Sequence, residues 1–302
     1  MEISAKLVKE LRDKTDAGIM ECKSALKEAS GDIEQAVEIL RKKGLSKAGK
    51  KGDRVASEGV IAMKIAPDFK KATLIELNSE TDFVAKNDGF KDLVAKTLDL
   101  VFENSIDDVS KLLTQQIEGM SYEEYLKSKI ATIGENIVVR RLRTFTCDAN
   151  QIVNGYVHHN FKLGALIKIE SPKASEFIEV AKGVAMHAAT MKPSYLCPKC
   201  VSDEVIAKET EIAKELLAKE GKPENMWEKI LPGKIAKFYE EVTLLKQKYI
   251  LDDKKSIEAF VNDSAKALQT TANIVDFVRF ELGEGIEKKV DNFAEEVAAQ
   301  MK

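Results

Sequence analysis

The feature that most constrains the fold is an internal duplication. Residues 72–77 resemble residues 165–170 at an offset of 93, whereas the Val-Ala-Lys triplets at 94–96 and 180–182 are only 86 apart. The first copy therefore holds seven more residues between its apolar strand and the helix that follows. They fall within residues 78–87, where Phe83 stands among polar neighbours. A loop added to one copy of a duplicated scaffold is a candidate functional site, because the core does not need it.

The competing interpretation of this loop is structural. Phe83 could fold back and fill a gap in the hydrophobic core, as buried aromatic side chains commonly do. The repeat alone favours neither interpretation.

Each copy is predicted to combine a small sheet with a helix, which makes the fold α+β. The predicted strands cover residues 59–63, 73–77 and 137–140 in the first copy, and 155–158, 166–169 and 277–280 in the second. The predicted helices cover residues 90–102 and 175–187. The second copy also holds 53 extra residues, dominated by helical runs at 204–219 and 226–245 with Gly and Pro between them. This pattern predicts an inserted antiparallel helical hairpin at about residues 200–248.

A compact three-helix unit is predicted before the duplicated core. Its apolar side chains recur at helical spacing, in the sets Leu7, Val8, Leu11; Ile19, Cys22, Leu26, Ala29; and Ile33, Ala36, Val37, Leu40. The predicted domains are residues 1–43 for this unit, 44–57 for a basic linker, 58–147 and 148–288 for the two core subdomains, and 289–302 for a C-terminal helix. The linker continues a basic run that starts at Arg41. We interpret it as a solvated tether; RNA binding is the alternative, but no aromatic residues interleave for base stacking.

Composition and motifs exclude several classes of function. The net charge of −3 is too small for nucleic acid or an anionic membrane to be the main partner, so we expect neither. No apolar run approaches the roughly 20 residues of a membrane span, and the N-terminus lacks the features of a signal or transit peptide. No nucleotide-binding, nucleophile-elbow or metalloprotease motif occurs, and the three histidines form no catalytic or metal pattern. We therefore predict a cytoplasmic bacterial protein that is not an enzyme and has no cofactor and no metal.

The spacing of Cys197 and Cys200 is that of zinc and redox sites. Zinc would need two further ligands, and beyond His187 no fourth is evident. A redox pair is expected at the start of a helix after a strand, whereas the residues before Cys197 read as a loop. We favour incidental cysteines, with zinc and redox chemistry as alternatives.

Several long motifs, in order along nearly the whole chain, resemble the elongation factor Ts family, whose members are guanine-nucleotide exchange factors of elongation factor Tu. The motifs lie at residues 7–45, 78–87, 133–137, 140–141, 221–224 and 279–288. The resemblance implies a ubiquitin-associated-like N-terminal domain, a two-part core and a helical hairpin.

The resemblance also implies roles for particular residues. Within the segment Thr81, Asp82, Phe83 and Val84, the central pair would enter the GTPase domain of elongation factor Tu and disturb the region that holds Mg²⁺ and the phosphates. The N-terminal residues Arg12, Ile19 and Met20, and His158 in the second subdomain, would contact the same partner. The C-terminal helix would extend this contact, and a homodimer through the core is a further expectation. The alternative functions are a helical adaptor and an RNA-binding protein without exchange activity.

Overall fold

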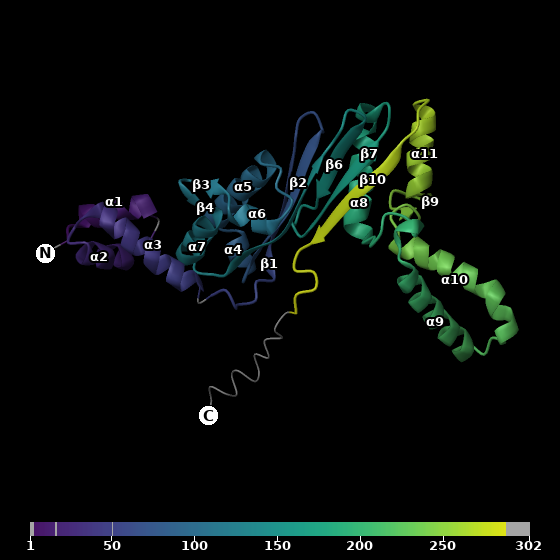
Figure 1. Cartoon of the computed structure of the whole chain (residues 1–302), viewed down its shortest axis with the longest axis horizontal. Coiled ribbons are helices and arrows are strands. Elements are labelled where there is room, and N and C mark those ends of the chain that lie inside the picture. Colours follow the sequence, from purple (N-terminus) through teal and green to yellow (C-terminus); the bar gives the residue numbers. More distant parts are fainter. Residues whose placement is uncertain (1–2, 16, 50, 288–302) are drawn as a thin grey trace. The chain divides into compact units, whose positions relative to one another are not determined.

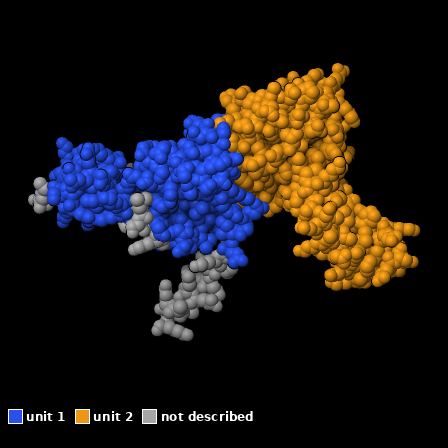
Figure 2. All heavy atoms as spheres, viewed as in Figure 1, with its two compact units in different colours: residues 1–60, 75–142, 282–302 blue, residues 61–74, 143–281 orange. Residues whose placement is uncertain are grey.

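The computed structural model describes residues 3–15, 17–49 and 51–287, whose elements are labelled in Figure 1. The chain forms two compact units, coloured separately in Figure 2. Unit 1 holds Met1–Val60, Ile75–Leu142 and Leu282–Lys302, and unit 2 holds Ile61–Leu74 and Arg143–Glu281. The division therefore crosses three strands, whereas the sequence analysis places the subdomain boundary between residues 147 and 148.

Unit 1 begins with a three-helix module formed by α1 (Ala5–Thr15), α2 (Ile19–Glu28) and α3 (Ile33–Gly49). The predicted apolar stripes supply its core, including the fully buried Leu11, Cys22 and Leu26. Ile19 does not join that core, because its side chain is 55% exposed. Helix α3 continues to Gly49, so the first part of the predicted linker at residues 44–57 is helical.

The first copy of the duplication contains a three-stranded sheet of order β1-β2-β5. Its strands are β1 (Glu58–Ile65), β2 (Lys71–Ser79) and β5 (Ile137–Thr146). Between β2 and β5 the chain forms α4 (Asp82–Ala85), α5 (Asp88–Glu103), α6 (Val109–Leu113), β3 (Gln116–Ile117), β4 (Met120–Ser121) and α7 (Tyr122–Ile133). The predicted helix at 90–102 is therefore confirmed as α5, and α7 was not foreseen.

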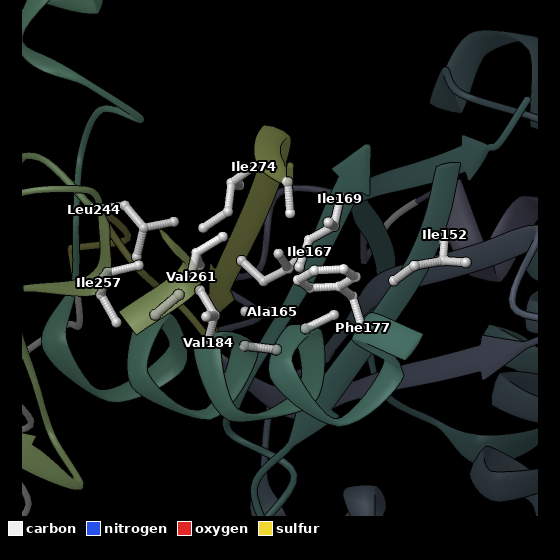
Figure 3. Packing of buried hydrophobic residues seen from close by; sticks show 14 of the residues in the cluster. Ile152, Ala165, Ile167, Ile169, Phe177, Val184, Leu244, Ile257, Val261 and Ile274 are labelled. Atoms are coloured by element: carbon white, nitrogen blue, oxygen red, sulfur yellow. The ribbon is translucent and has the colours of Figure 1, made fainter. Parts of the chain in front are cut away.

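Unit 2 contains the second sheet, of order β10-β7-β6, in which both pairings are antiparallel. Its strands are β6 (Gln151–Val157), β7 (Leu163–Glu170) and β10 (Asn273–Glu281). In both sheets the strand that comes second along the chain is central, which supports the duplication. The 3-10 helix η1 (Ala174–Phe177) leads directly into α8 (Ile178–Met191). Figure 3 shows α8 beside this sheet, with Phe177 and Val184 among the buried apolar side chains.

The inserted hairpin consists of α9 (Asp203–Lys219) and α10 (Trp227–Val242), joined through η3 (Glu224–Met226). Before it lies the short η2 (Pro198–Cys200), and after it come β8 (Lys248–Tyr249), β9 (Asp252–Ser256) and α11 (Ile257–Ala267). The predicted hairpin and the α+β fold are confirmed, whereas α11 was missed. The predicted C-terminal helix at residues 289–302 lies outside the described residues.

Candidate functional site

The added loop of the first copy forms one short helical turn between β2 and α5. Thr81 precedes this turn in an extended conformation, and its side-chain oxygen accepts a hydrogen bond from the Val84 N–H at 3.3 Å. A hydroxyl in this position satisfies one of the N–H groups left unpaired at a helix start. Asn87 does the same for α5 by accepting from the Gly89 N–H at 2.8 Å. The loop is therefore folded by local polar capping.

A carboxylate distant in the sequence anchors the same turn. The Thr81 N–H and hydroxyl donate to the two oxygens of Glu135, at 3.0 and 2.6 Å. Glu135 lies between α7 and β5. Because both of its oxygens are used, this contact fixes both the position and the orientation of the residue that starts the turn.

The residues on either side of this contact are also joined. The Asn136 N–H donates to a Glu80 oxygen at 2.6 Å, and the Asn136 side chain donates to the backbone oxygens of Gly52 and Arg54 at 3.3 and 2.8 Å. Residues 80–81 and 135–136 thus form a polar anchor for the turn. The motif at 133–137, for which the sequence indicated no role, thus supplies half of this anchor.

The turn presents Phe83 to solvent. Its side chain is 80% exposed, which contradicts the interpretation that this ring fills the core. The Asp82 carboxylate accepts from the Lys86 ammonium at 2.8 Å, and that ammonium lies 6.0 Å from the centre of the Phe83 ring. A large exposed aromatic side chain held by an ordered polar frame is typical of a contact for another molecule.

A second polar cluster in unit 1 ties the segment after β10 to the sheet. The fully buried carboxylate of Glu76 accepts from Arg140 at 3.1 Å, from Arg141 at 2.5 Å and from the Gly283 N–H at 2.9 Å. Arg141 also pairs with Glu284 at 3.1 Å. The motifs at 140–141 and 279–288 therefore meet at Glu76, which their sequence alone did not indicate.

The predicted residues of the three-helix module are all on its surface. Met20 is 75% exposed and Ile19 is 55% exposed, at the start of α2, and Arg12 is exposed on α1. Two apolar side chains in the first turn of one helix form an exposed apolar spot on a small module.

The predicted unit 2 residue, His158, follows β6 and is half-buried. Its backbone N–H donates to the Leu163 oxygen at 2.9 Å, and its Nδ1 is buried with no hydrogen-bond partner in the described part of the chain. Nearby in sequence, Phe161 is 55% exposed and has a left-handed φ of 58°. Phe161 was not selected from the sequence, although an aromatic residue between the predicted strands at 155–158 and 166–169 was available as a signal.

Cys197 and Cys200 are joined in a disulfide, a pairing that was not foreseen from the sequence. Within residues 3–15, 17–49 and 51–287, no three His, Cys, Asp or Glu side chains are grouped so that they could hold a metal ion. In that same part of the chain, no helix has the length and apolar character needed to cross a membrane.

Comparison with known proteins identifies the family. The family described as Elongation factor TS matches residues 80–284. The chain is 52% identical to elongation factor Ts of a Nitratiruptor species, with 100% of both chains covered. It is 45% identical to elongation factor Ts of a Helicobacter pylori strain and 47% identical to that of Wolinella succinogenes, with 99% of each chain covered. The chain belongs to the elongation factor Ts family.

Membership in the elongation factor Ts family places the chain among translation elongation factors. The matched region includes the Phe83 turn, its Glu135 anchor and the segment held by Glu76. The three-helix module lies before the matched region, but the full-length relatives cover it.

Proposed function

We propose that this protein is a guanine-nucleotide exchange factor for elongation factor Tu. It binds the GDP-bound GTPase and promotes release of GDP, so that GTP can bind. It performs no covalent chemistry of its own. The observation that carries the proposal is the 80% exposure of Phe83 on a turn that Glu135 holds in place.

The physical basis is displacement of the groups that hold the nucleotide. Tight GDP binding depends on backbone and lysine contacts to the phosphates and on a Mg²⁺ ion that needs near-ideal octahedral geometry. Insertion of Phe83, with Asp82 beside it, shifts those groups slightly and weakens several charge-assisted contacts at once. The anchored turn supports this role because a rigidly held side chain loses little conformational entropy on binding.

Exchange then follows from linkage between two ligands of one GTPase. If the factor weakens GDP binding by a given ratio, GDP weakens factor binding by the same ratio. A coupling of about 3 kcal/mol corresponds to a roughly 150-fold change in affinity. The complex can therefore lose either ligand, and GTP can later displace the factor.

The remaining predicted residues form docking contacts in this proposal. Arg12, Ile19 and Met20 place an apolar spot and a positive charge on the N-terminal module, and His158 contributes from unit 2. We add Phe161 to this set, because it is an exposed aromatic side chain next to the His158 turn. We further propose a cytoplasmic bacterial protein and a homodimer through the core.

The deciding experiment measures release of a fluorescent GDP from the cognate elongation factor Tu, with excess unlabelled GDP and substoichiometric amounts of this protein. Multiple-turnover acceleration is expected for the wild type, and a loss of more than about ten-fold for Phe83→Ala, the size expected for a buried aromatic contact. Leu251→Ala is the matched control, because it removes an exposed apolar side chain that the proposal does not place at the partner, and it should leave the acceleration unchanged. No acceleration by the wild type would contradict the proposal, whereas an equally active Phe83→Ala would reject the insertion mechanism alone.

Two other functions remain for comparison. An adaptor would bind its partner without changing nucleotide release, and it has no need for the Phe83 turn. Binding of this protein to elongation factor Tu with no effect on the rate of GDP release would therefore favour the adaptor. An RNA-binding protein using residues 41–54 would show an affinity that falls steeply with salt and is lost when those lysines are neutralised.

A further inference from the structure

The structure places a disulfide in unit 2, just before the first helix of the helical hairpin. Cys197 and Cys200 have Cα atoms 5.2 Å apart, within the range that a disulfide spans, and the Cys200 N–H donates to the Cys197 oxygen at 2.9 Å. Cys197 is half-exposed and Cys200 is exposed, so reagents can reach the pair. Redox chemistry at this pair was one of the alternatives left open by the sequence.

The two remaining cysteines are less suited to thiol chemistry. Cys22 is fully buried in the three-helix module. Cys147 is half-buried, and burial raises the pKa of its thiol, which lowers the thiolate fraction at neutral pH. By contrast, Cys197 and Cys200 lie at the surface, where a small thiol or disulfide can reach them.

The pair lies at a junction between anchored backbone and a free-standing element. Just before it, the Leu244 N–H donates to the Tyr195 oxygen at 2.8 Å and the Leu245 N–H donates to the Leu196 oxygen at 3.0 Å. These bonds join the chain that enters the hairpin to the chain that leaves it. Just after the pair, Ser202 caps the first turn of α9. A cross-link in this short loop therefore restricts the backbone at the base of the hairpin.

We propose that Cys197 and Cys200 are a reversible thiol–disulfide site, which reacts with low-molecular-weight disulfides such as oxidised glutathione and stiffens the base of the hairpin when oxidised. The thiolate of Cys200 attacks one sulfur of the small disulfide, whose sulfur–sulfur bond breaks and releases one thiolate. The thiolate of Cys197 then attacks the Cys200 sulfur and releases the second. The protein loses two electrons, the small disulfide gains them, and the two cysteine protons end on the two released thiols.

A metal site is the competing use of a Cys-x-x-Cys pair. Two thiolates would need two further ligands. In the described ranges no group of three or more His, Cys, Asp or Glu side chains could hold a metal ion, so the pair lacks the further ligands that zinc needs.

The test counts free thiols after equilibration in glutathione buffers of increasing oxidised fraction, using the full chain and no GTPase. Acid quenching, maleimide labelling under denaturing conditions and mass spectrometry give the count. The reduced protein should label at four cysteines, and the oxidised protein should retain the two free ones, Cys22 and Cys147. Cys147→Ser is the matched control and should still lose two labels on oxidation. Cys200→Ser should form no internal disulfide.

Hydrogen exchange tests the structural consequence in the same samples. The amides of Leu244 and Leu245 should exchange several-fold more slowly in the oxidised protein than in the reduced protein, because opening of the hairpin base is restricted. Full labelling in the most oxidising buffer would overturn the redox site, as would a stoichiometric metal that protects both thiols. Equal exchange rates in the two states would overturn the stiffening.

Discussion

Both copies of the duplicated core bury a phenylalanine at the start of their long helix, but the first copy also carries one on the surface. Phe90 in α5 and Phe177 before α8 are both fully buried. Phe83 stands seven residues before Phe90 and is 80% exposed. Since Phe90 already fills the position at the helix start, the core of the first copy has no need of Phe83.

The two connections are also stabilised differently. In the second copy, η1 is held by apolar packing, with Phe177 inside the cluster shown in Figure 3. In the first copy, the turn that carries Phe83 is held by the polar contacts of Thr81 and Glu135. Stability is therefore expected to depend on the apolar contacts of Phe177, whereas the proposed partner contact depends on the exposed ring of Phe83. The following predictions test that separation.

The largest loss of stability is expected for Phe177→Ala. Removing a fully buried phenyl ring costs about 3–5 kcal/mol, because apolar contacts are lost and a cavity remains. Urea unfolding of the full chain measures this change, and Phe177→Leu, which keeps most of the volume, should cost less. A loss below about 1 kcal/mol for the alanine variant would show that η1 does not depend on the core.

A smaller loss is expected when the charge in the central strand of the first sheet is removed. The buried side chains of β7 are apolar, whereas β2 buries Glu76 against Arg140 and Arg141. Glu76→Gln keeps the size but leaves two guanidinium groups facing a neutral amide. We expect a loss of about 2–3 kcal/mol, below the usual 3–5 for breaking a buried pair, because the arginines are 26% and 28% exposed.

The control for this variant is Glu284→Gln. Its side chain is 44% exposed, so it should change the free energy of unfolding by less than about 1 kcal/mol. Equal losses for the two variants would mean that burial of Glu76 is not what makes its charge important.

Apolar periodicity predicted the elements whose burial follows a local stripe, and it failed where burial depends on distant residues. The module helices and the hairpin repeat apolar residues at helical spacing, so their positions were predictable. Ile19 fits such a stripe and yet is exposed, because helical spacing alone does not show whether another element covers the residue.

The polar anchor of the Phe83 turn could not be predicted from local sequence. Thr81 and Glu135 are 54 positions apart, and no spacing rule relates a threonine before a short turn to a glutamate after another helix. The same holds for Glu76 and Gly283, which are separated by 207 positions. The resemblance to the family marked these segments, but only the structure shows which atoms meet.

An intermediate loss of stability is expected when the contact between Glu135 and Thr81 is weakened. Glu135→Gln replaces a carboxylate that accepts two hydrogen bonds from Thr81 with an amide that has one acceptor oxygen. The expected loss is about 1–2 kcal/mol, in the range for a hydrogen bond to a charged group. The more specific result is local: the Val84 amide should exchange faster with solvent, and nucleotide release should be less accelerated.

The control for the anchor is Glu124→Gln at the start of α7, which is also a capping carboxylate but lies outside the turn. It should affect α7 and leave Val84 exchange unchanged. Protection of Val84 that is unaffected by Glu135→Gln would show that local capping alone holds the turn.

A pH-dependent contribution to stability is expected from His187 in the second copy. His187 is fully buried near the end of α8, and its Nδ1 accepts a hydrogen bond from the Ile250 N–H at 3.1 Å. A neutral imidazole whose Nδ1 accepts carries its proton on Nε2, which donates to the Gln247 side-chain oxygen at 2.9 Å. Desolvation by burial lowers the pKa of His187 below its ordinary value, whereas the hydrogen bond to Gln247 raises it less. The buried residues of α5 include no histidine, so the corresponding helix lacks this contribution.

The direction of the effect follows from proton binding. An unfolded histidine titrates near pH 6.5, and the folded one titrates lower, so between these values the unfolded state binds more protons. Stability from this group is therefore complete above the unfolded pKa and declines as the pH falls below it. Urea unfolding at pH 7.5 and 5.5 should show a smaller difference for His187→Gln than for the wild type, and an unchanged difference would exclude His187 as the cause.

The smallest effect on stability is expected for Phe83→Ala. This variant distinguishes a ring that contacts the partner from a ring that belongs to the core. An exposed side chain on a turn held by polar contacts contributes little to folding, so the free energy of unfolding should change by less than about 0.5 kcal/mol. Phe177→Ala should show the opposite pattern, a large loss of stability with exchange intact in the fraction that remains folded. If Phe83→Ala destabilised the protein as Phe177→Ala does, the ring would belong to the core in solution, and its loss of exchange activity would be a folding defect. A stable Phe83→Ala that no longer accelerates GDP release would instead assign the ring to the partner.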